Sequence, residues 1–189
     1  MFPPIIIPSA AGDADVGDTI NYSVRLNKAD NPQFSRVFTG SRTDQKKGAL
    51  LLVFKRSASA SSSEHWYGYA TDSGAASGAK CHFLNSDKLF FEVGGTIAYS
   101  FTTTQVFRDF AKFYHLYIEW DTTQATASDR YKVFLNGVQI TAFDSISYPA
   151  LNYAGTQWGS NDLSNFCYGY TSGQSPDGYI ARLALVDGS

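Results

Sequence analysis

The sequence predicts an all-β chain that folds as a two-sheet antiparallel β-sandwich behind an extended N-terminal arm. Short runs rich in β-branched and aromatic residues recur from Ile20 onward, and clusters of turn-forming residues separate them. No run keeps a helical period over several turns. The runs number about a dozen, and that many short strands in one domain require two packed sheets, as in a sandwich or jelly roll.

The composition fits one domain and excludes several classes of partner. The chain has 189 residues, of which 43% are hydrophobic, enough to build one substantial core. Its formal net charge is -2, and acids and bases are interspersed, so it lacks an electrostatic footprint for nucleic acid or an anionic membrane. No stretch reaches the roughly 20 apolar residues that a membrane helix needs. We therefore expect neither nucleic acid nor membrane as a partner.

Residues 1–19 differ in composition from the rest and are expected to form an arm, followed by the sandwich domain over residues 20–189. The start, MFPPIIIPSA, lacks a basic region and is broken by prolines, so it is a poor secretory signal. Proline favours extended backbone, so this segment cannot bury its own apolar side chains by folding on itself. We expect Phe2, Ile5, Ile6 and Ile7 to dock on a partner surface.

The expected strands follow one another with recognisable turns. They cover residues 20–26, 49–56, 64–70, 79–85, 88–93, 96–101, 113–121, 131–135, 138–143, 166–170 and 177–187. The run ALLLVFKR at 49–56 is almost continuously apolar, as a central strand is. Ser86-Asp87 and Gly94-Gly95 separate successive runs of a meander. Asn136-Gly137 predicts a two-residue hairpin, because a type I′ turn needs positive φ at both central residues.

The strand at 113–121 carries two carboxylates in a spacing that glycanases use. Leu116, Ile118 and Trp120 are expected on its core face, with Glu119 and Asp121 on the other face. Glycanases with a concanavalin-like jelly roll carry Glu-x-Asp-x-x-Glu on such a strand, whereas this chain has Gln124 at the last position. An amide does not titrate in the relevant range, so we expect no catalytic residues and no enzyme activity.

Thiol and imidazole side chains show no metal-binding pattern. His65, His82 and His115 fall on three separate expected strands without ligand spacing, and we interpret them as structural. Cys81 and Cys167 are too few for a disulfide framework, and the sequence leaves open whether they pair or stay as two buried thiols.

Several segments together resemble a known family. They are Phe54-Lys55-Arg56-Ser57, Phe113-Tyr114-His115, residues 121–130 and 135–139, Tyr148-Pro149, Asn152-Tyr153, residues 177–181 and Val186-Asp187-Gly188. In these the chain resembles the laminin-G-like, concanavalin A-like lectin/glucanase domains of tailed-phage virion proteins, over roughly residues 20–188. The resemblance implies a two-sheet jelly roll with a binding or structural role in a virus particle.

The family resemblance also raises the question of calcium. Laminin-G-like domains often hold a calcium ion at the sandwich rim. Here Asp162 and Asp177 lie in expected loops without the clustered oxygen ligands that calcium needs, so we expect no metal or other cofactor, and a calcium ion stays open as the alternative.

The loop over residues 147–166 is the best glycan candidate. Tyr153 and Trp158 offer aromatic faces for sugar stacking, while Asn152, Asn161 and Asp162 offer groups that bind hydroxyls. The alternative is that the rings plug the open end of the sandwich.

These observations predict a non-enzymatic accessory protein of a bacteriophage virion, synthesised in the host cytoplasm. A capsid decoration or cement-type role is favoured, with the arm bound to other virion proteins and the sandwich facing outward in a homo-oligomer or larger assembly. A tail-associated lectin that recognises a host surface glycan is the alternative, and a glycan hydrolase is a third.

Overall fold

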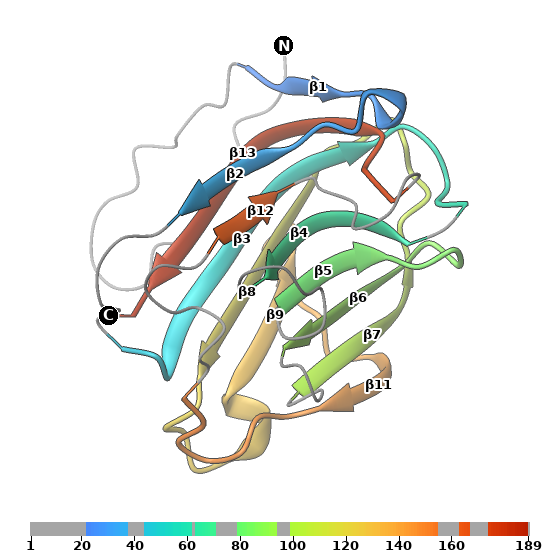
Figure 1. Cartoon of the computed structure of the whole chain (residues 1–189). Coiled ribbons are helices and arrows are strands. Elements are labelled where there is room, and N and C mark those ends of the chain that lie inside the picture. Colours follow the sequence, from blue (N-terminus) through green and yellow to red (C-terminus); the bar gives the residue numbers. More distant parts are fainter. Residues whose placement is uncertain are drawn as a thin grey trace, which may run out of the picture.

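The computed structural model describes residues 22–37, 44–61, 63–70, 79–93, 99–154, 163–166 and 174–188, and within them the chain forms two facing antiparallel sheets (Figure 1). Sheet A contains, in spatial order, β1 (Val24–Leu26), β13 (Gly178–Asp187), β3 (Lys47–Arg56), β8 (Tyr114–Asp121), β9 (Tyr131–Leu135) and β10 (Val138–Gln139). Sheet B contains β11 (Phe143–Ser147), β7 (Tyr99–Val106), β6 (Lys88–Val93), β5 (Ala79–Phe83), β4 (Glu64–Ala70), β12 (Leu163–Phe166) and β2 (Phe34–Val37). Two short 3₁₀ turns, η1 (Lys28–Asp30) and η2 (Ala127–Asp129), complete the described elements.

The predicted two-sheet sandwich is confirmed, and most expected strands lie where the sequence placed them. β4 and β6 match their expected ranges to the residue. The expected strand at 138–143 is wrong, because β10 ends at Gln139 in sheet A and the chain then crosses to β11 in sheet B. β2 was not predicted at all. The expected arm over residues 1–19 lies outside the described residues.

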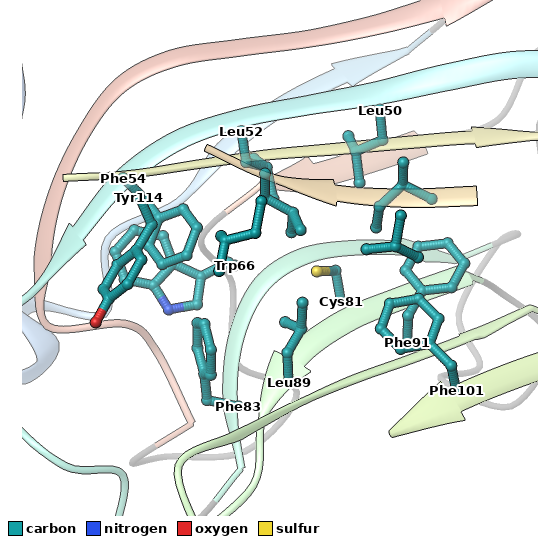
Figure 2. Packing of buried hydrophobic residues seen from close by; sticks show 14 of the residues in the cluster. Leu50, Leu52, Phe54, Trp66, Cys81, Phe83, Leu89, Phe91, Phe101 and Tyr114 are labelled. Atoms are coloured by element: carbon teal, nitrogen blue, oxygen red, sulfur yellow. The ribbon is translucent and has the colours of Figure 1, made fainter. Parts of the chain in front are cut away.

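The core lies between the two sheets and comes from strict alternation along the strands. In β3, Leu50, Leu52 and Phe54 point toward sheet B (Figure 2). Phe54 meets Trp66 and Phe83 at one end of this core. Phe54 packs against Trp66, with 4.8 Å between ring centroids. Each such side chain contributes about 1.5–3 kcal/mol when it leaves water. This aromatic layer fixes how the two sheets face each other.

Cys81 belongs to the same core and is a free, fully buried thiol. Burial raises its pKa far above the ordinary value, so the thiol stays protonated and unreactive. Cys167 lies outside the described residues.

β3 is a central strand, as its continuous apolar run predicted. It pairs with β13 on one side and with β8 on the other. The side chains that alternate with its core residues are also apolar, namely Ala49, Leu51 and Val53, and they lie on the outer face of sheet A. The strand is therefore apolar on both faces.

The Asn136-Gly137 turn has the predicted geometry. Its two residues have φ of 51° and 80°, and it joins β9 to β10 in register. Asn136 also accepts a hydrogen bond from the backbone N–H of His115 through its side-chain oxygen, at 2.9 Å. The turn thus anchors the start of β8 as well as reversing the chain.

Among the described residues, no helix is long and apolar enough to span a membrane.

Candidate functional site

The rim at the end of β8 is built from two loops that hold each other. The guanidinium of Arg130 donates hydrogen bonds to the carbonyls of Gln124 (2.7 Å), Ala125 (2.7 Å) and Pro149 (3.1 Å). Thr122 donates its hydroxyl to the Tyr153 carbonyl at 2.8 Å. The loop after β8 and the segment after β11 are therefore fixed to one another before any ligand arrives.

The rim carries two of the predicted glycan-binding residues. Asn152 is exposed at a left-handed position (φ 58°), and its backbone N–H donates to the Thr122 carbonyl at 2.7 Å. Tyr153 is half-buried and meets Tyr99 of the core edge to face, with 5.8 Å between ring centroids. The amide of Asn152 is thus free to meet a ligand, while Tyr153 partly closes the end of the sandwich. Trp158, Asn161 and Asp162 lie outside the described residues.

Asp121 at this rim organises its loop. It accepts hydrogen bonds from the Thr123 N–H (3.0 Å), the Thr123 hydroxyl (2.6 Å) and the Gln124 side-chain amide (2.8 Å). Partial burial raises its pKa, but these hydrogen bonds outweigh that effect and leave the pKa below the ordinary value. Asp121 is therefore ionised and suited to holding a turn. Gln124, which stands where glycanases have a glutamate, closes the same turn.

No second glutamate is placed to work with Glu119. Its side chain lies on the outer face of sheet A, next to Lys132 in the cross-strand register. Glu64 and Glu92 both belong to sheet B, where Glu64 is buried and Glu92 pairs with Lys80 at 2.8 Å. Glycosidases need two carboxyl groups on either side of one bond, which these positions do not provide.

Two of the three histidines come together, which sequence reasoning missed. His65 of β4 and His82 of β5 are cross-strand partners on the outer face of sheet B, with their rings stacked 4.8 Å apart. His115 belongs to the other sheet. Only the strand register could have revealed the pair. In the part of the chain that the structure describes, no group of three potential metal ligands occurs.

A buried ionic cluster closes the opposite end of the sandwich and was also missed. The fully buried Arg56 donates to Glu64 (3.0 Å), to Asp87 (2.9 Å) and to the Phe107 carbonyl (2.8 Å). Arg108 donates to the other oxygen of Asp87 at 2.7 Å. Burial raises the pKa of Asp87, but hydrogen bonds led by that from Arg108 outweigh it and lower the pKa to about 2. Every guanidinium nitrogen of Arg56 is occupied, so this cluster is structural.

The two outer faces of the sandwich differ in chemistry. On sheet A, one row of cross-strand neighbours runs Ala184, Leu51, Tyr117 and Phe134, and we call it the apolar row. On sheet B, the corresponding surface holds the histidine pair, Thr102, Ser145 and the Lys80–Glu92 ion pair. The outer face of sheet A is therefore apolar along this row, with the Glu119–Lys132 cross-strand pair beside it, whereas the outer face of sheet B is mostly polar.

Sequence comparisons with protein-family models and with curated proteins find no match. Comparison with solved structures finds similar folds. Domains LG4-5 of the mouse laminin α1 chain have a TM-score of 0.61 and 14% identity, covering 96% of this chain and 44% of that one. The heptameric SAP-like pentraxin from Limulus polyphemus has a TM-score of 0.55 and 12% identity, covering 82% and 69%. Domain 4 of AbnA, an extracellular arabinanase from Geobacillus stearothermophilus, has a TM-score of 0.55 and 14% identity, covering 94% and 74%, and was solved with arabinotriose.

The fold is a concanavalin A-like jelly roll. This confirms the fold implied by the sequence resemblance, and at such identities the likeness concerns the fold. Among the described residues, the rim with Asn152 and the outer face of sheet B carry groups able to bind a polar ligand.

Proposed function

We propose that this jelly roll is a non-enzymatic accessory protein of a bacteriophage particle, most simply a capsid decoration or cement-type protein. Its N-terminal arm and the sheet A side attach to other virion proteins, and its sheet B side and rim face outward. The resemblance of residues 20–188 to phage virion domains motivates the particle setting.

The observation that supports this proposal best is the contrast between the two outer faces. An antiparallel sheet that faces water on one side normally alternates apolar and polar residues. Sheet B does so, with Lys80, His82 and Glu92 outward. Sheet A instead turns the partly exposed apolar row outward across its central strands, with Glu119 and Lys132 in the row beside it. A sandwich whose two outer faces differ in this way suits a protein that attaches to a support through one face and exposes the other face to solvent.

The arm is the second part of the proposal. It leads into β1, the edge strand of sheet A, so it is attached to the apolar side of the domain. The apolar side chains of Ile5, Ile6 and Ile7 are removed from water only when another surface covers them. In an oligomeric assembly, a neighbouring virion protein would provide that surface.

Deleting residues 1–10 tests the attachment. We expect the truncated protein to keep its fold, measured by circular dichroism, and to lose association with particles in co-sedimentation. The substitution Val106→Lys, at an exposed valine of β7 in sheet B, is the matched control and should leave association unchanged. Full association of the truncated protein would overturn the role of the arm.

A receptor-binding lectin is the second candidate, and the rigid rim favours it. Asn152 is exposed on a loop that Arg130 and Thr122 already hold, so binding would cost little ordering. AbnA domain 4, of similar fold, was solved with arabinotriose. In this reading Asn152, Tyr153, Trp158, Asn161 and Asp162 bind a host glycan. A glycan array with the wild type, Trp158→Ala and Asn152→Ala tests it, and a wild type that binds no glycan rules it out.

A further inference from the structure

We propose that, in the free protein, the Phe2–Pro8 segment folds back and covers the apolar row on sheet A of its own chain. The row and the arm each present apolar surface that needs a cover, and the topology brings the two within reach. This inference concerns the isolated chain and does not depend on the particle setting.

The apolar row crosses four strands in register. Ala184 of β13 lies opposite Leu51 of β3, Leu51 opposite Tyr117 of β8, and Tyr117 opposite Phe134 of β9. The Tyr117 and Phe134 rings approach with 5.9 Å between centroids. In the next row, Val186 lies opposite Ala49 and is 50% exposed. The result is an apolar strip made of this row together with Ala49 and Val186, and Glu119 and Lys132 border it in the next row.

The direction of β1 leads the arm toward this strip. Val24 pairs with Ile180 and Leu26 with Gly178, so β1 runs antiparallel to β13. The chain that precedes Val24 therefore approaches sheet A from the end of β13 that carries Ala184 and Val186. The arm enters the domain on the side of the strip.

The length of the chain before β1 allows a return over the sheet. About 15 residues separate Pro8 from Val24, and an extended chain spans at most about 3.5 Å per residue, so they reach up to about 50 Å. From β1 to β8 there are three strand spacings of about 4.8 Å, or about 14 Å. Gly12 and Gly17 lie in this connection and permit the reversal of direction.

The docking segment matches the strip in length and shape. The row spans three strand spacings, about 14 Å, and the four residues Ile5–Pro8 in extended form span about 13 Å. Prolines on both sides of the isoleucines hold them extended, so little backbone entropy is lost on docking. On attachment to a particle, the arm then leaves the apolar row of its own chain and docks on an apolar surface of a neighbouring virion protein.

Photo-crosslinking of the isolated full-length protein tests this placement. The residue p-benzoylphenylalanine replaces Ile6, the protein is irradiated, and the monomer and dimer fractions are digested and analysed by mass spectrometry. We expect crosslinks in the monomer fraction, to peptides that contain Leu51, Tyr117 or Ala184. Crosslinks to other peptides, or products found only at the dimer mass, would overturn the proposal.

Substitutions on the strip sharpen the test. Leu51→Lys and Val186→Lys should each lower the crosslink yield several-fold, because a charge at the strip opposes apolar docking. Val106→Lys is the matched control, since Val106 is 40% exposed on β7 in the other sheet, and its yield should equal that of the parent. If Leu51→Lys does not fold, the crosslink yield of Val186→Lys still tests the proposal, because Val186 is half-exposed. The crosslinking result does not depend on whether the protein binds a particle. The proposal of particle attachment and the proposal of a folded-back arm can therefore fail independently.

Discussion

The imidazole ring of His65 lies flat against that of His82 across β4 and β5, with ring centroids 4.8 Å apart and ring planes 9° from parallel. Both residues are buried on the outer face of sheet B, and the Phe90 ring packs at a tilt of 55° against His82. Burial, followed by the neighbouring His82 and Lys80, lowers the pKa of His65 to about 3. Burial and Lys80 also lower the pKa of His82, to about 4, although Glu92 opposes them. The pair is therefore neutral at pH 7.

Acid should destabilise the protein through this pair. The unfolded chain takes up protons on histidine near pH 6.5, whereas the folded pair resists until about pH 4 and then pH 3. Below pH 6.5 the unfolded state thus binds more protons, and stability falls as pH falls through this window. Each histidine contributes about 1.4 kcal/mol per pH unit. His115, whose pKa burial also lowers, acts in the same direction.

Two measurements check this prediction. In proton NMR, the ring signals of His65 and His82 should not titrate between pH 8 and pH 5. In urea unfolding, His82→Gln should lose less stability than the wild type between pH 7 and pH 5. Ordinary titration of both rings near pH 6.5 would contradict the stacked, buried arrangement.

Removing Arg56 should be among the most damaging single changes. The substitution Arg56→Met leaves Glu64 and Asp87 buried without their shared cation, and breaking such a pair costs about 3–5 kcal/mol. Arg108→Ala is the matched control, because it removes one charge-assisted hydrogen bond from a 59% exposed side chain and leaves Asp87 bonded to Arg56, so it should cost less, about 1.5–3 kcal/mol. Urea midpoints of the two variants measure the difference. Equal losses would mean that the cluster is not held by its buried arginine.

Periodic features of the fold were predictable from sequence because they depend on neighbours along the chain. The apolar run of β3 predicted a central strand, and Asn136-Gly137 predicted its turn from backbone conformation alone. By contrast, β2 is short, and its one partner among the described strands is β12, more than a hundred residues later. A strand of that kind owes its existence to a distant partner, so local pattern does not reveal it.

The candidate site was less predictable because it depends on register. Asp121 and Glu119 share a face, as alternation requires, but only the structure shows Asp121 occupied by Thr123 and Gln124. The histidine pair likewise appears only once β4 and β5 are aligned. Tyr153 was predicted to stack on sugar or to plug the sandwich, and its contact with Tyr99 shows that it packs on the core.

Substitution of the two β8 carboxylates, Asp121 and Glu119, should lower stability by different amounts. Asp121→Ala removes the acceptor for three hydrogen bonds and should cost about 1–3 kcal/mol of stability. Glu119→Ala, on the open outer face, should cost less than about 1 kcal/mol. Thermal unfolding compares the two. Neither the wild type nor either variant should release reducing sugar from polysaccharides, and release by the wild type that Glu119→Ala abolishes would restore the hydrolase hypothesis.

Gly178 should tolerate no side chain, for a reason different from that at Gly137. It opens β13 opposite Arg56, and a Cβ added there would lie 2.0 Å from the Lys55 carbonyl oxygen. Because that neighbour is backbone of the adjacent strand, Gly178→Ala must push β13 away from β3, at a cost on the order of 3 kcal/mol. At Gly137 a Cβ meets nothing within 4 Å, and Gly137→Ala costs only the strain of φ +80°, about 1 kcal/mol. Urea unfolding of both variants gives the comparison. If Gly178→Ala were as stable as the wild type, β13 and β3 would have to lie farther apart at Gly178 and Lys55 than in this structure.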